Sequence, residues 1–117
     1  MKLKLLIVED NPAVRRIIRS IVAPLADEIH ECEDGVEALA AYQTHRPDFV
    51  LMDIAMSSLD GIAATRQIRA ADPAAKVIIV TNYDEADLRE AARAAGACDY
   101  VLKEDLLTLR QLLRMAS

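Results

Sequence analysis

The chain has 117 residues, of which 53% are apolar, and a formal net charge of −5. This length predicts a single domain over residues 1–117, with enough apolar content to build a core without disulfides. An acidic chain with 3% aromatic residues is poorly suited to direct nucleic-acid binding, which depends on basic side chains and stacking platforms.

No apolar run reaches the ~18 residues that a membrane span needs, and the N-terminus has no signal-peptide cleavage pattern. Cys32 and Cys98 do not form a disulfide framework, and a cytoplasmic protein is expected.

Five short apolar runs are predicted to be strands, and each is followed by an amphipathic segment. The runs are Leu3–Val8, Glu28–Cys32, Phe49–Met52, Val77–Val80 and Cys98–Leu102. Three of them are rich in Val and Ile and apolar on both sides of the pleat, as in strands covered on both faces. The run at Glu28–Cys32 is more polar, which favours an edge strand.

Helices are predicted between these runs. Asn11 followed by Pro12 is typical of a helix start, and Asp60 and Asp84 precede two further helices. A last amphipathic segment covers Asp105–Met115. The first helix carries apolar residues at helical spacing at Val14, Ile17, Ile18, Ile21, Val22 and Leu25.

The alternation predicts an α/β fold: a (βα)5 doubly wound, three-layer sandwich around a parallel five-stranded sheet of order 2-1-3-4-5. In such sheets the functional site lies beyond the carboxyl ends of the strands, near the point where the strand order reverses. The residues that follow each strand are therefore the first candidates for a site.

Four predicted strands end in polar residues: Glu9-Asp10, Asp53, Thr81 and Lys103. Any one such acid is more often a turn or helix-cap residue than a ligand, but together they place charge of both signs at one sheet edge. Three acids in one crevice repel one another unless cations join them. Lys103 supplies one positive charge, and an oxygen-only ligand set favours Mg²⁺, with Mn²⁺ as a substitute.

The same residues suit phosphoryl transfer. A carboxylate beside Mg²⁺ can attack phosphorus, and Asp53 is the best nucleophile because it stands alone at a central strand end. Glu9 and Asp10 would then hold the metal, while Lys103 and Thr81 would bind the transferred oxygens.

The sequence resembles the receiver domain of two-component response regulators over essentially its whole length. The matching motifs are Val8-Glu9-Asp10-Asn11, Leu51-Met52-Asp53-Ile54-Ala55-Met56, Leu59-Asp60-Gly61, Val80-Thr81 and Tyr100-Val101-Leu102-Lys103. The resemblance implies that a histidine kinase or histidine phosphotransfer protein phosphorylates Asp53. The chain would be a phosphoacceptor that catalyses its own phosphorylation and slow autodephosphorylation, and not an enzyme with a separate substrate.

The resemblance also assigns finer roles. Mg²⁺ would bind the side chains of Asp10 and Asp53 and the backbone carbonyl of Ala55, with Glu9 acting through a water. Thr81 and Tyr100 would move on phosphorylation and alter the face made by the fourth helix, fifth strand and fifth helix. That face would contact a downstream protein, an effector domain outside this sequence, or a second copy of the chain.

Two positions depart from the family pattern. Ser57 and Glu104 stand where the family commonly has prolines. In the family the second proline follows a cis bond. Because cis bonds are rare without proline, a trans Lys103–Glu104 bond is expected. Ala55 and Tyr83 occupy positions that tune dephosphorylation. The Ala55 methyl group cannot orient an attacking water, and the Tyr83 ring can shield the site, so a long-lived phosphorylated form is predicted.

Other functions remain as alternatives. The main one is a receiver-like docking module that works without phosphorylation, although such modules typically lose the acids or the lysine. A flavodoxin-like cofactor carrier would need a loop rich in glycine and hydroxyl groups after the first strand, where Glu9 and Asp10 would repel phosphate. A dehalogenase-type phosphatase would need a second aspartate at position 55, which is Ala55.

Several residues have no assigned place in this site. Cys32 and Cys98 should lie on opposite sheet edges, too far apart to bond. His30 and His45 are expected at the surface, away from the strand ends. The first helix carries Arg15, Arg16 and Arg19, which form either a kinase docking face or an ordinary solvated helix face.

Overall fold

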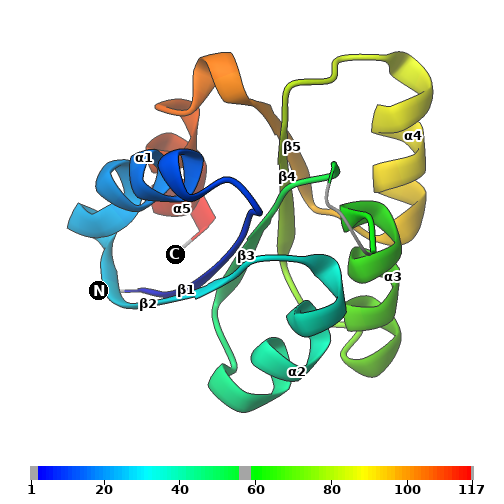
Figure 1. The fold of residues 1–117 in the computed structure, drawn as a ribbon, viewed down its shortest axis with the longest axis horizontal. Coiled ribbons are helices and arrows are strands. Elements are labelled where there is room, and N and C mark those ends of the chain that lie inside the picture. Colours follow the sequence, from blue (N-terminus) through cyan, green and yellow to red (C-terminus); the bar gives the residue numbers. More distant parts are fainter. Residues whose placement is uncertain (1–2, 56–58, 117) are drawn as a thin grey trace.

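The computed structural model describes residues 3–55 and 59–116. Within these residues, five parallel strands form one sheet in the order β2-β1-β3-β4-β5 (Figure 1). They are β1 (Leu3–Val8), β2 (Ala26–Cys32), β3 (Phe49–Met52), β4 (Val77–Thr81) and β5 (Asp99–Leu102). The predicted doubly wound fold and its strand order are confirmed.

Helices follow the strands and cover both faces of the sheet. They are α1 (Pro12–Val22), α2 (Gly35–His45), α3 (Gly61–Ala71), α4 (Ala86–Ala95) and α5 (Thr108–Ala116), with short 3₁₀ turns at Ala23–Leu25 and Lys103–Asp105. Helices α1 and α5 lie on one face, and α2, α3 and α4 on the other (Figure 1). In the described part of the chain, no helix is long and apolar enough to cross a membrane.

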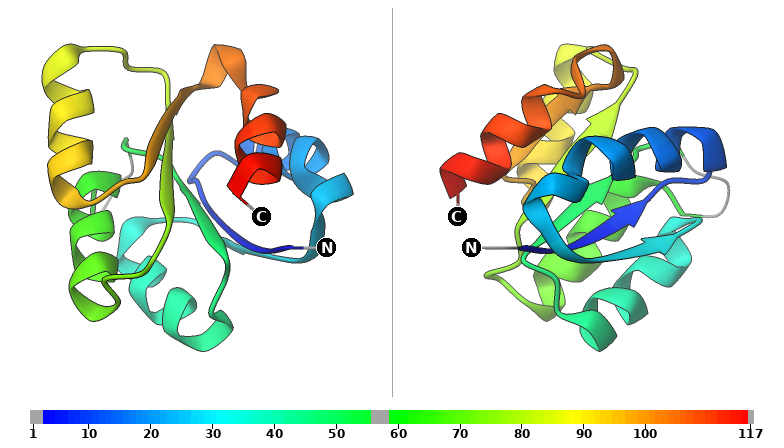
Figure 2. Two further views of the ribbon diagram at one scale, coloured as in Figure 1. Left: turned by 180° about the vertical axis from the view of Figure 1, so that it is seen from behind. Right: turned by 90° about the vertical axis from the view of Figure 1, so that its left-hand side faces the viewer.

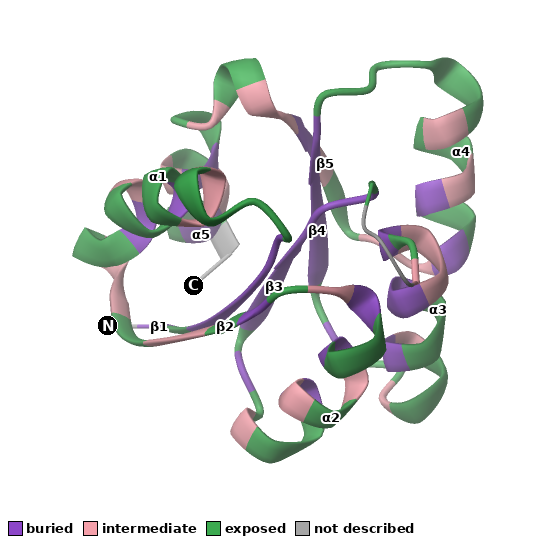
Figure 3. Cartoon of the chain, viewed as in Figure 1, coloured by how far each residue is buried: buried purple, intermediate pink, exposed green. Residues whose placement is uncertain are grey.

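The core has two layers because successive strand side chains point to opposite faces. On β1, Leu5 and Ile7 pack under α1 and α5, while Leu6 and Val8 pack under α2 and α3. Figure 3 shows the inner strands β3 and β4 buried, whereas the edge strand β2 is partly exposed, as are the outer helix surfaces. The helix residues buried on the α1–α5 side are Ile18, Val22, Leu109 and Leu113.

Helix starts follow the sequence signals in two of the three predicted places. The side chains of Asn11 and Asp60 accept hydrogen bonds from the first turns of α1 and α3, as predicted. At α4, by contrast, Glu85 occupies the cap position without a side-chain hydrogen bond. Asp84 pairs instead with Arg89, at 2.6 Å.

Two expectations about the helices are wrong. Ile17 belongs to the predicted apolar stripe of α1 but is 52% exposed, so the buried stripe is narrower than the sequence indicates. Helix α5 begins at Thr108 and not at Asp105, because Lys103–Asp105 forms a 3₁₀ turn first. Helices α1 and α5 lie side by side (Figure 2), where Arg110 Nε donates to the Ile21 carbonyl at 2.7 Å.

Candidate functional site

The sheet brings the predicted strand-end residues to one edge. Val8 of β1 lies opposite Met52 of β3, so Glu9 and Asp53 both follow paired residues. The Asp53 amide donates to the Val8 carbonyl at 3.0 Å, which holds the two strands together up to their ends. On the other side of β3, Thr81 pairs with Leu102 and therefore lies beside the start of the Lys103 turn.

Three of these side chains form an ion-paired cluster. The Lys103 ammonium lies 2.9 Å from Glu9 Oε1 and 3.5 Å from Asp53 Oδ1. Both acids are nearly inaccessible, with exposed fractions of 1% for Glu9 and 4% for Asp53. One half-buried ammonium therefore faces two buried carboxylates, which leaves the cluster with an excess of negative charge.

Burial dominates the protonation of the two acids. It raises the pKa of Glu9 from 4.5 to about 7, against the opposing effect of the hydrogen bond from Lys103. Burial also raises the pKa of Asp53, again against the attraction of Lys103. For Lys103 burial acts in the other direction, but the hydrogen bond with Glu9 and the charge of Asp53 outweigh it, so the pKa of the ammonium is raised. The cluster lacks positive charge.

The oxygen atoms fit a hard divalent cation. Single carboxylate oxygens of Glu9, Asp10 and Asp53 all lie within 4.8 Å of one another, with Asp10 on the exposed side. Glu9 Oε1 is fully buried, and the Lys103 ammonium lies 2.9 Å from it. An all-oxygen set with three carboxylates and one ammonium is the kind of site that Mg²⁺ occupies while keeping several waters.

A hydrogen-bonded path connects the end of β4 to the surface of β5. Thr81 is fully buried, and its hydroxyl oxygen accepts a hydrogen bond from the Tyr83 amide at 3.3 Å. The Tyr100 hydroxyl donates to the Tyr83 carbonyl at 2.7 Å, and the Arg89 guanidinium lies 4.6 Å from the centre of the Tyr100 ring. The backbone of Tyr83, itself 45% exposed, therefore lies between the two residues predicted to switch.

Helix α3 begins in close contact with the end of β3. A Cβ atom on Gly61 would lie 1.8 Å from the Asp53 carbonyl oxygen, so only glycine permits α3 to begin this close to β3. Ala55 is exposed at the mouth of the site, while Ser57 lies outside the described residues. In the described part of the chain every peptide bond is trans, which confirms the expectation for Lys103–Glu104.

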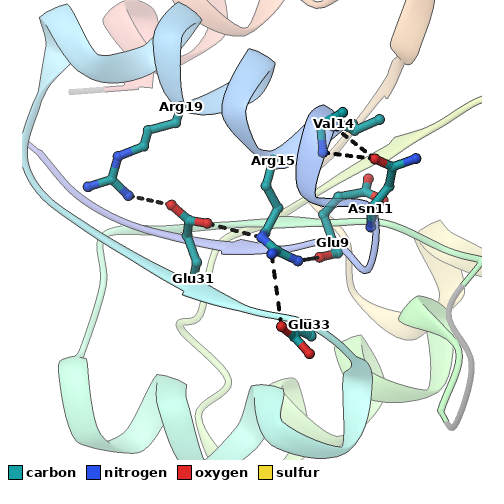
Figure 4. A network of polar contacts seen from close by, with 8 residues as sticks. Glu9, Asn11, Val14, Arg15, Arg19, Glu31 and Glu33 are labelled. Atoms are coloured by element: carbon teal, nitrogen blue, oxygen red, sulfur yellow. Dashed lines mark hydrogen bonds and ion pairs between the residues drawn. The ribbon is translucent and has the colours of Figure 1, made fainter.

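The sequence did not predict that an arginine of α1 binds the backbone of Glu9. Arg15 Nη1 donates to the Glu9 carbonyl at 2.7 Å, and its Nε donates to Glu31 at 3.0 Å (Figure 4). Arg19 binds the second carboxylate oxygen of Glu31. Both arginines thus connect α1 to β2, and Arg15 also connects it to the end of β1, whereas Arg16 is exposed.

The remaining candidates lie away from the cluster. Cys32 on β2 and Cys98 just before β5 are both free and lie at opposite sheet edges, as predicted. His30 and His45 are also distant from the strand ends, but each is half-buried and their rings stack on one another. That contact has no sequence signal, because the two histidines come from different elements.

Comparison with known proteins gives a consistent result. The chain matches the sequence model described as the response regulator receiver domain over residues 5–114. It is 35% identical to the response regulator MprA of Mycobacterium sp. (strain KMS), covering all of this chain and 53% of that protein. It is 40% identical to the chemotaxis protein CheY of Listeria monocytogenes, over 86% of each chain. A solved LuxR-family two-component response regulator from Aurantimonas sp. SI85-9A1 superposes with a TM-score of 0.92 at 33% identity, covering 99% of this chain and 85% of that one.

Proposed function

Since the chain belongs to the response regulator receiver domain family of two-component signalling, we propose that it accepts a phosphoryl group on Asp53 from a phosphohistidine donor. The observation that carries this proposal is the position of Lys103, whose ammonium contacts both Glu9 and Asp53. The chain would thus be a phosphoacceptor that promotes its own modification, and not an enzyme that turns over a separate substrate.

Asp53 is the nucleophile in this proposal. One of its carboxylate oxygens forms a bond to phosphorus while the phosphorus–nitrogen bond of the donor breaks, and the electron pair of that bond stays on the donor imidazole. Burial keeps water away from the resulting acyl phosphate. Lys103 and the Thr81 hydroxyl are the protein groups that would bind the phosphoryl oxygens.

The acidic residues would hold the metal. Asp10, Asp53 and the Ala55 carbonyl would bind Mg²⁺ directly, and Glu9 would bind it through a water; Mn²⁺ would serve in its place. The bound cation would offset the negative charge of the transferring phosphoryl group. The cation would also offset the negative charge of the carboxylates that Lys103 alone does not neutralise.

The conformational change would pass from Thr81 to Tyr100 by way of the Tyr83 backbone. A phosphoryl group on Asp53 would attract the Thr81 hydroxyl, which now accepts from the Tyr83 amide. Because the Tyr83 carbonyl binds the Tyr100 hydroxyl, a shift of this segment would release or turn the Tyr100 ring. The surface of α4, β5 and α5 would change as a result.

The proposed partners follow from this scheme. A histidine kinase or histidine phosphotransfer protein would supply the phosphoryl group. The altered α4–β5–α5 face would bind a downstream protein, an effector domain or a second copy of the chain. The chain spans about half the length of its MprA relatives, so such an effector domain is part of the proposal. We place the protein in the cytoplasm, with no direct role for nucleic acid.

The test is chemical phosphorylation. Purified protein is incubated with acetyl phosphate, with and without Mg²⁺, and its intact mass is measured. We expect one added phosphoryl group only with Mg²⁺, and none in Asp53→Asn. Asp27→Asn, which changes an exposed aspartate on β2, is the matched control and should be modified normally. Wild-type protein that stays unmodified, and that does not bind beryllofluoride with Mg²⁺, would support the docking-module alternative instead.

A further inference from the structure

A second cluster of side chains that can bind metal lies at β2, the edge strand of the sheet, away from the strand-end site. Glu28 and His30 are two residues apart on β2, so both point to the face covered by α2. His45 is the last residue of α2, and Arg46 ends the helix in a left-handed conformation. The edge strand and the end of one helix therefore bring three potential ligands together.

The three side chains are in direct contact. His30 Nε2 lies 2.6 Å from Glu28 Oε2, and the rings of His30 and His45 stack with centroids 3.5 Å apart and an interplanar angle of 11°. One ligand atom from each residue lies within 4.8 Å of the other two. Donors bound to one zinc ion at about 2.0–2.2 Å are at most about 4 Å apart, so the three side chains must move closer together. Because an imidazole binds a metal in the plane of its ring, the two stacked rings must also rotate out of their parallel arrangement.

From this geometry we propose that Glu28, His30 and His45 form a binding site for a divalent transition-metal ion, with Zn²⁺ as the first candidate. Two imidazoles and a carboxylate are the donor set that zinc prefers, and a water fills the fourth position. The site does not depend on phosphorylation of Asp53.

The charges of the cluster suit a cation. Zinc binds neutral imidazole, in which one ring nitrogen carries the proton and the other offers a free lone pair. The hydrogen bond from His30 holds the pKa of Glu28 below its ordinary value, and Lys4, which lies opposite Glu28 on β1, acts in the same direction. Glu28 is therefore anionic and available as a ligand.

The two clusters of this chain differ in the metals they select. The strand-end acids offer only oxygen atoms, which suits Mg²⁺. The β2 cluster offers nitrogen from two histidines, which favours Zn²⁺, Ni²⁺ or Cu²⁺ over Mg²⁺. Excess Mg²⁺ can thus saturate the strand-end acids without competing at the β2 cluster.

The experiment is a titration of the full, tag-free chain with ZnCl₂ in excess MgCl₂. Because the chain contains only two histidines, the imidazole proton signals in an NMR spectrum come from this cluster alone. We expect the signals of both rings to shift together and to saturate at one equivalent of Zn²⁺, with matching stoichiometry by calorimetry.

Variants decide whether these residues are the ligands. His30→Gln and His45→Gln should each weaken Zn²⁺ binding by at least about tenfold, since even the loss of an outer hydrogen-bond partner of a metal ligand costs that much. Having both variants guards against one that fails to fold. Cys98→Ser is the matched control, and it should bind Zn²⁺ like the wild type. Zn²⁺ affinity within about twofold of wild type in both folded histidine variants, or a shift of only one ring, would overturn the proposal.

Discussion

The high pKa of Glu9 predicts an unusual pH dependence of stability in the metal-free protein. Burial raises this pKa from 4.5 to about 7 in the folded chain, whereas the unfolded chain keeps the ordinary value. Between these two pH values the folded protein holds a proton that the unfolded protein has released. The Glu9 contribution to the free energy of unfolding therefore falls as pH rises through this window.

The magnitude follows from the shift. The difference of 7 − 4.5 corresponds to a loss of about 3–4 kcal/mol, at about 1.4 kcal/mol per unit of pKa. In Glu9→Gln the side chain has no ionisable group, so the variant does not undergo this loss. The wild type and the variant should thus be similarly stable near pH 4.5, and the variant should be the more stable by about 3–4 kcal/mol above pH 7.

The assay is urea denaturation of both proteins across this pH range, with a chelator present to exclude divalent cations. Asp53, whose pKa is also raised, titrates in both proteins and contributes in the same direction. A stability difference that stays constant with pH to within about 0.5 kcal/mol would refute the reasoning, as would a wild type that gains on the variant at high pH.

Three further changes test other parts of the site. Ala55→Asn should shorten the lifetime of phosphorylated Asp53, measured by intact mass after the donor is removed, because an amide can position the attacking water that a methyl group cannot; equal lifetimes contradict this. Arg15→Ala should lower the free energy of unfolding by about 1–3 kcal/mol in urea, because it removes the bonds to Glu31 and the Glu9 carbonyl. Arg16→Ala, at an exposed position, should change it by less than about 0.5 kcal/mol, and equal losses would count against the assigned role. Tyr100→Phe should cost about 0.5–1.5 kcal/mol in the same assay through the lost bond to the Tyr83 carbonyl, and a neutral effect would show that this bond adds nothing.

The position of the site was predictable because it depends on chain order. Parallel strands joined by helices place all their carboxyl ends on one sheet edge, so Glu9, Asp53 and Lys103 had to share that edge once the five strands were recognised. Short apolar runs and their polar end residues are sufficient for that inference. The burial of Glu9 to 1% was not predictable, since it depends on how the loops close around the end of β1.

Contacts that depend on how a helix is rotated about its axis could not be predicted from the sequence. The periodicity of α1 predicts which side faces the sheet, but not that Arg15 reaches the Glu9 carbonyl or that Ile17 stays exposed. The stacking of His30 on His45 likewise depends on where α2 ends over the edge strand. The late start of α5 follows from the 3₁₀ turn at Lys103–Asp105, a stretch that carries no strong helix-breaking residue.

The charge balance at the strand ends connects stability with reactivity. A single ammonium on Lys103 faces two carboxylates, which leaves a shortage of positive charge, and burial raises the pKa values of both Glu9 and Asp53. A dianionic phosphoryl group would deepen the shortage if it arrived first, because buried like charges repel strongly at low dielectric. We therefore expect the divalent cation to bind before the phosphoryl donor. A bound cation would then offset this excess of negative charge and would keep Asp53 available as an anion.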